Sequence, residues 1–117
     1  MPNQYQSEAE IAAVVEGFEK CTTDKADFTH LSHLTVATYH LRNSSPEEAL
    51  QKVRRGLLRF LDHHGIGQTK YKERLTQAWM ERVQSVIEQM EPDASLVAVT
   101  NEVIVRLSDS RMTIEDD

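Results

Sequence analysis

The middle of the chain carries a clear helix start, Ser45-Pro46-Glu47-Glu48. A serine N-cap accepts a hydrogen bond from a free backbone N–H, and a proline at the first helical position sacrifices no hydrogen bond. Glutamates in the first turn face the positive end of the helix dipole. Apolar residues then recur at intervals of three and four, and Gly65 can close the helix in the left-handed conformation. The segment is therefore predicted to be a helix over residues 46–64.

Four further segments share this helical periodicity. Ser7 to Glu10 form a capping box at the start of the first of them, and Pro92 ends the segment 70–90. The last segment is rich in β-branched residues, which leaves helix and strand both open, but a lone strand would have no partner, so a helix is favoured. The predicted helices span residues 8–20, 29–42, 46–64, 70–90 and 94–107, followed by a frayed acidic tail over 108–117.

Short connections place successive helices roughly antiparallel, so the fold class is predicted to be all-α, an up-and-down bundle of four to five helices. A chain of 117 residues fits a single helical domain over 1–117. The apolar stripes predict a core, and the residues expected to be largely buried are Leu34, Leu41, Leu50, Leu57, Phe60, Leu61, Leu75, Trp79 and Val86.

Composition narrows the compartment and the partners. Cys21 is the only cysteine, so no intramolecular disulfide or cysteine cluster is possible, which suits a reducing cytoplasm. The apolar runs are too short to span a bilayer, so we expect a soluble, cytoplasmic protein with no membrane partner. A formal net charge of −6 argues against nucleic acid as a partner, although seven basic and two acidic residues lie between Lys52 and Arg74. That basic segment reads most simply as a solvated helix face.

The sequence lacks the common catalytic and nucleotide-binding motifs, including the phosphate loop, the dinucleotide fingerprint, the nucleophile elbow and the H-E-x-x-H pair. No set of nucleophile, base and orienting residue can be assembled from it. We therefore predict no catalytic residues and no cofactor, and expect that the protein is not an enzyme.

Histidine is the unusual residue type here. His30, His33 and His40 fall on the segment 29–42, and His63-His64 end the next one. Helical geometry points His30 among aliphatic neighbours, so it is predicted to be buried and hydrogen-bonded rather than metal-bound. A structural or partner-orienting role, a metal or haem site and acid–base catalysis all remain open for these histidines.

Tyr71 and Lys72 are predicted to flank the apolar stripe of the helix 70–90. Like His30 and His33, they straddle the apolar and polar sides of their segment, and such residues meet across a helix seam when two helices pack. Two imidazoles, a phenol and an ammonium together would suit an anionic small molecule better than a metal ion. The alternative is that these groups only satisfy one another at the surface.

Two segments resemble a family of uncharacterised small helical bacterial proteins that carry an F-x-H-x-x-H-L motif and a later Y-H-E-T motif. The first corresponds to Phe28 to Leu34, and the second to Tyr71-Lys72-Glu73-Arg74. The resemblance, over residues 26–107, implies a bacterial origin and a helical fold but no activity. The second motif departs from the family: Lys72 replaces a histidine and Arg74 a threonine, which opposes a metal there.

Two functions follow. The first is a helical domain acting through a protein partner or as a homo-oligomer. The alternative is a domain that binds an anionic small molecule, or a metal, with candidate residues His30, His33, Tyr71 and Lys72. A pocket with convergent polar groups would favour ligand binding, and a continuous exposed apolar strip would favour a partner.

Overall fold

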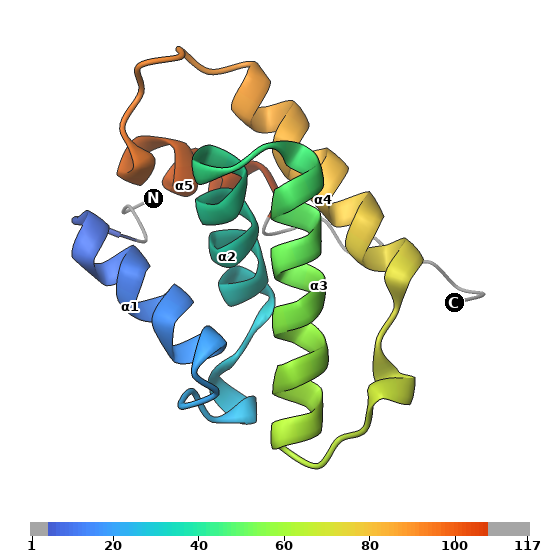
Figure 1. Cartoon of the computed structure of the whole chain (residues 1–117). Coiled ribbons are helices and arrows are strands. Elements are labelled where there is room, and N and C mark those ends of the chain that lie inside the picture. The colour runs from blue at the N-terminus through green and yellow to red at the C-terminus, as the bar shows by residue number, and fades with distance from the viewer. Residues whose placement is uncertain (1–4, 108–117) are drawn as a thin grey trace.

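The computed structural model describes residues 5–107 and contains five α-helices and two short 3₁₀-helices within them (Figure 1). No strand occurs among the described residues, which confirms the all-α bundle and resolves the last segment as a helix. The predicted tail 108–117 lies outside them. In chain order the elements are α1 (Glu8–Glu19), η1 (Lys25–Asp27), α2 (His30–Asn43), α3 (Pro46–His63), η2 (Gln68–Lys70), α4 (Glu73–Glu88) and α5 (Leu96–Leu107).

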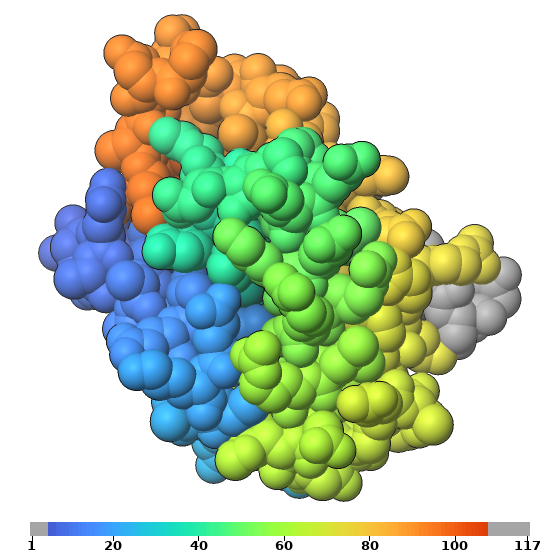
Figure 2. Space-filling view, viewed as in Figure 1, coloured from blue at the N-terminus to red at the C-terminus, as the bar shows by residue number. Residues whose placement is uncertain are grey.

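The helix α2 lies at the centre of the molecule and packs against each of the other four α-helices. Those four form a ring around it, because α1 contacts α3 and α5, and α4 contacts the same two helices (Figure 1). The five consecutive residues 34–38 are all buried, which covers a full helical turn and requires neighbours on every side. On the face seen in the space-filling view, the side chains of α3 lie between those of the α1–η1 region and those of α4 (Figure 2).

The polar residues of this central helix find their partners inside the bundle. Thr38 donates to the carbonyl of Leu34 at 2.7 Å, and Thr35 donates to that of Leu31 at 2.9 Å. Such bonds to the preceding turn allow a hydroxyl to be buried in a helix without an unpaired donor. Central burial of α2 therefore does not require a wholly apolar sequence.

Three of the caps are those that the sequence predicts. Ser7 and Ser45 both form complete capping boxes, and Gly65 has a φ of 71° after the end of α3. The largest boundary error is at α4, which begins at Glu73 rather than at residue 70; α4 also ends at Glu88 rather than 90, and α5 begins at Leu96 rather than 94. Gly67, with a φ of 96°, leads instead into η2, and the next two residues, Tyr71 and Lys72, are extended. These two therefore precede α4 and do not flank its apolar stripe as predicted.

Four of the predicted core residues, Leu34, Leu41, Phe60 and Val86, are buried. The other five are less completely enclosed and only half-buried: Leu50, Leu57, Leu61, Leu75 and Trp79. All five do face inward, but four of them line a cavity and Leu50 lines a groove. Helical periodicity identifies the apolar face of each helix, but it carries no information on whether the helices opposite fill the space between them.

Stacked aromatic rings join α1, the η1 segment and α3. Phe18 and Phe28 stack with their ring centroids 4.7 Å apart, and Phe28 lies 5.0 Å from the ring of Phe60. Gly56 provides the room on α3, since a Cβ atom there would lie 2.4 Å from the Phe18 ring. Phe28 and Phe60 of this stack line the cavity described below.

Among the described residues, no helix combines the length and apolar character needed to cross a membrane.

Candidate functional site

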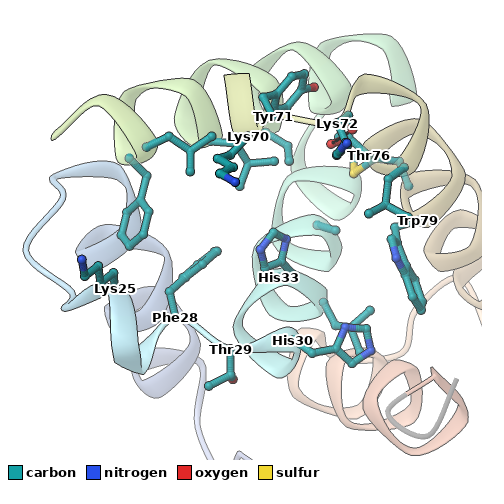
Figure 3. Close-up of a pocket in the computed structure, with 18 of the residues that line it drawn as sticks. Lys25, Phe28, Thr29, His30, His33, Lys70, Tyr71, Lys72, Thr76 and Trp79 are labelled. Atoms are coloured by element: carbon teal, nitrogen blue, oxygen red, sulfur yellow. Dashed lines mark hydrogen bonds between the residues drawn. The ribbon is translucent and has the colours of Figure 1, made fainter. Parts of the chain in front are cut away.

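A cavity of about 480 Å³ lies between α2, α3 and α4, and is bordered by η1 and η2 (Figure 3). This volume lies within the usual range for small-molecule sites. Its walls are mainly aliphatic and aromatic, with Leu57 and Leu61 from α3, Leu75 and Trp79 from α4, and Phe28 before α2. The half-buried leucines are therefore accessible to a ligand in this cavity rather than to open solvent alone.

The ionisable groups on the cavity wall are basic or neutral. Three lysines, Lys25, Lys70 and Lys72, border the cavity, and all three are exposed. Figure 3 shows the Lys70 amine directed toward the interior. Within the part of the chain that the structure describes, neither aspartate nor glutamate lines this cavity. In a chain of net charge −6, this absence of carboxylates makes the cavity a locally favourable place for an anion.

His33 projects toward the centre of the cavity from the second turn of α2 (Figure 3). Its ring lies 4.6 Å from that of Phe28 and makes no hydrogen bond with the described residues. His33 is exposed, because its imidazole faces the cavity rather than a packed neighbour. Protein nevertheless surrounds that cavity, and the resulting desolvation, helped by nearby His30, lowers the pKa of His33 to about 4. His33 is therefore neutral near pH 7.

His30 lies one turn earlier, at the start of α2 and on the same cavity wall. Its Nε2 is 3.3 Å from the carbonyl of Leu107, and since a carbonyl can only accept, this nitrogen carries the proton. The ring also contacts Trp79 edge-on, with centroids 4.8 Å apart. His30 is hydrogen-bonded as predicted, but it is half-buried where burial was predicted. The cavity beside it accounts for the exposed part.

Tyr71 borders the cavity, but its hydroxyl already has a partner. It donates to Oε1 of Glu73 at 2.7 Å, and Glu73 also accepts from Arg54 through both of its oxygens. Hydrogen bonds from Arg54 lower the pKa of Glu73 to about 2, with a further contribution from Tyr71. Burial raises the pKa of Tyr71, and the bond to Glu73 adds to this effect. Tyr71 is therefore held in place by an ion pair between α3 and α4.

All four candidate residues, His30, His33, Tyr71 and Lys72, line the same cavity. Lys72 does so as the N-cap residue of α4. Two more lysines and Thr76 on the same wall were not singled out from the sequence. Lys70 belongs to the basic segment 52–74, so the charge asymmetry of that segment is the signal that could have identified it.

A second, shallower groove of about 430 Å³ runs along the other side of Met80. Leu41 and Leu50 form part of its wall, and its ionisable groups, Glu47, Glu81 and Glu88, are all acidic. It therefore has the opposite charge from the cavity at His33. Substitutions in the groove can therefore serve as controls for substitutions in the cavity in binding experiments.

No three His, Cys, Asp or Glu side chains converge as a set of metal ligands among residues 5–107. His40, the third histidine of α2, is instead buried with its Nε2 2.8 Å from a carboxylate oxygen of Glu19. His64 is the C-cap residue of α3, and its ring lies 4.3 Å from that of Phe60.

Comparison of the chain with protein-family models, with curated proteins and with solved structures finds no match.

Proposed function

We propose that this protein binds a small organic anion with an apolar body, and that the ligand occupies the cavity between α2, α3 and α4. The observation that carries the proposal is the combination of an apolar wall with ionisable groups that include three lysines and two histidines but no described carboxylate. The leucines and Trp79 would bury an apolar body, and the lysines and His33 would receive the charged group. Because the wall offers no cysteine, serine or carboxylate among the described residues, the proposal is limited to binding.

A protein partner, or self-association, is the second candidate. Such a function would be favoured by a continuous exposed apolar strip. Within the described residues, Val105 is the exposed large hydrophobic side chain, at 56%. A single residue of this kind does not define an interface, so we rank ligand binding first. The single, buried Cys21 supports a cytoplasmic location, which stays a prediction.

The proposal can be tested with two probes of equal chain length and opposite charge, decanesulfonate and decyltrimethylammonium. Each is titrated into the protein below its micelle concentration, with calorimetry and the fluorescence of Trp79, the only tryptophan, as readouts. We expect decanesulfonate to bind at least tenfold more tightly, because the cavity presents cations and no described carboxylate. Equal affinity for the two probes would contradict the proposal.

A matched pair of variants locates the binding site. Leu57 and Leu50 are both half-buried leucines of α3, but Leu57 lines the cavity and Leu50 lines the acidic groove. Leu57→Trp should fill part of the cavity and weaken decanesulfonate binding at least tenfold, whereas Leu50→Trp should leave it nearly unchanged. The opposite order would place the ligand in the groove and refute the proposed site.

A further inference from the structure

His33 is the one histidine of α2 that lacks a hydrogen-bond partner among the described residues. His30 donates to the carbonyl of Leu107, and His40 is paired with Glu19. His33 is instead held by ring contact with Phe28 and faces the cavity, as Figure 3 shows. Its ring nitrogens are therefore available to a molecule bound there, and a bound acceptor would supply the partner that the protein does not.

The charges around His33 disfavour a proton on its ring while the cavity holds no anion. On α2 it has His30 beside it, and Lys25 of η1, Lys70 of η2 and Lys72 before α4 contribute the cations on the wall. Tyr71 is the remaining ionisable group. The described wall residues of α3 and α4 carry no charge, so nothing there compensates an imidazolium. Desolvation and His30 together keep the pKa of His33 at about 4.

An anion in the cavity reverses this balance. Its negative charge would lie in a low-polarity space, where Coulomb attraction to an imidazolium is much stronger than in water. A charge-assisted hydrogen bond from a ring N–H to the anion adds to that attraction. Protonation of His33 then becomes favourable at a pH at which the ligand-free protein leaves it neutral.

We propose that the charged group of the ligand binds against His33, and that this imidazole takes up one proton from solvent as the ligand enters. The inference rests on the proposed function, because it concerns the same cavity and the same class of ligand. It makes His33 the residue that selects for an anion, while the lysines at the border attract negative charge more generally.

The proton uptake predicts how affinity depends on pH. Below about pH 4, His33 is already protonated without ligand, so affinity for a permanently ionised anion should not change. Between that pH and the pKa that His33 has in the complex, each unit of rising pH should weaken binding up to tenfold. Above the pKa in the complex, neither state carries the proton and affinity should level off. Decanesulfonate suits the measurement because its head group stays ionised throughout.

Calorimetry at pH 6 in two buffers of different ionisation enthalpy measures the proton count directly. We expect close to one proton taken up per decanesulfonate bound by the wild-type protein. His33→Asn should remove the uptake and flatten the pH profile while retaining weaker binding. The matched control His63→Asn changes an exposed histidine outside the cavity lining and should leave both unchanged.

The imidazole C–H resonances of the wild-type protein provide a readout that needs no variant. At pH 6, the His33 signal should move from its neutral to its protonated position as decanesulfonate is added. Binding without proton uptake, or uptake that survives His33→Asn, would overturn this inference and leave the proposed function standing. No binding of decanesulfonate at any pH would overturn both.

Discussion

Gly56 is a position of α3 that has no room for a side chain. A Cβ atom there would lie 2.4 Å from one atom of the Phe18 ring and 2.8 Å from another. Alanine would favour the helix by about 1 kcal/mol over glycine, but displacing a ring from a packed stack costs about 1 to 3 kcal/mol. We expect Gly56→Ala to lower the free energy of unfolding, measured by urea denaturation, with a net loss of about 1 kcal/mol.

A double-mutant cycle attributes that loss to the ring. Phe18→Leu removes the atoms that the new methyl group would meet, so the two substitutions together should cost less than the sum of the single effects. Additive costs would show that the Phe18 ring is not the obstacle. Arg55→Ala, at the exposed neighbouring position of the same helix, should change stability by less than about 0.5 kcal/mol.

At the residue scale, the sequence predicts which side chains come together but not how each is employed. His30, His33, Tyr71 and Lys72 do line one cavity, because residues at the border of an apolar stripe meet where helices pack. The individual partners depend on distant parts of the chain. His30 donates to Leu107 on α5, 77 positions later, and local spacing cannot reveal such a bond.

Between elements, the ion pair of Arg54 and Glu73 joins the middle of α3 to the first residue of α4. Gln77 also donates to Glu73, so the carboxylate is bound from three residues in all, including Tyr71. This arrangement fixes the connector that carries Lys70 and Lys72 past the cavity. The pair is about one third exposed, so solvent screening reduces its contribution to about 1 kcal/mol.

The pH dependence of stability should reveal this pair. The pKa of Glu73 is depressed from 4.5 to about 2 in the folded protein, so its stabilising effect is complete above pH 4.5 and is lost as pH falls toward 2. We expect Glu73→Gln to be less stable than wild type by about 1 kcal/mol at pH 7, with the difference shrinking between pH 4.5 and 2. Urea denaturation across this range provides the measurement.

The control for this prediction is Glu81→Gln, which neutralises an exposed carboxylate on the same helix. Its stability difference from wild type should be small at every pH in the series. A pH-independent deficit in Glu73→Gln would show that lost packing or hydrogen bonding, rather than the charge of Glu73, stabilises the junction.

The two helix starts whose capping boxes were read from the sequence were predictable at this scale, whereas the start of α4 was not. The Ser7 and Ser45 starts are confirmed because each cap is encoded within four residues. The start of α4 is different: Lys72 makes no side-chain cap bond, and Gly67 and the packing of η2 decide where the helix begins. The helix predicted over residues 70–90 therefore included residues of the connector, of which Tyr71 and Lys72 are extended in the fold.

For the whole molecule, Asn101 closes the structure by joining the N-terminal segment to α5. Its side chain accepts from the backbone N–H of Tyr5 at 3.0 Å and donates to the Tyr5 carbonyl at 2.9 Å. The Tyr5 hydroxyl reaches Thr35 on the central helix at 2.9 Å, and all three residues are buried. One amide therefore satisfies both backbone groups of a residue 96 positions away.

We expect Asn101→Asp to be destabilised by about 2 to 4 kcal/mol near pH 7, because a buried carboxylate cannot donate to the Tyr5 carbonyl and carries an unpaired charge. Thermal and urea unfolding would measure the loss. Lowering the pH should recover part of the stability as the carboxyl becomes protonated and regains a donor. A variant as stable as wild type at pH 7 would show that the two hydrogen bonds between Asn101 and Tyr5 contribute little to the free energy of unfolding.

The arrangement of four helices around α2 could not be predicted from the sequence. In the sequence, the polar residues Thr35, Thr38 and His40 suggest that part of this helix faces solvent. All three are buried because the preceding turn and Glu19 supply their partners. Which helix occupies the centre depends on tertiary contacts that a single helix does not record.

The cavity beside His33 also sets the stability of the fold against the room for a ligand. A larger side chain at Ala37, or at Leu57 on the facing helix, would add contacts across the space between α2 and α3 and remove an unfilled volume, which in a close-packed interior usually strengthens a fold. The same change would leave less room for a guest molecule. Directed evolution for heat resistance alone would consequently favour substitutions that fill this cavity. The most thermostable variants would then be those that no longer bind a ligand.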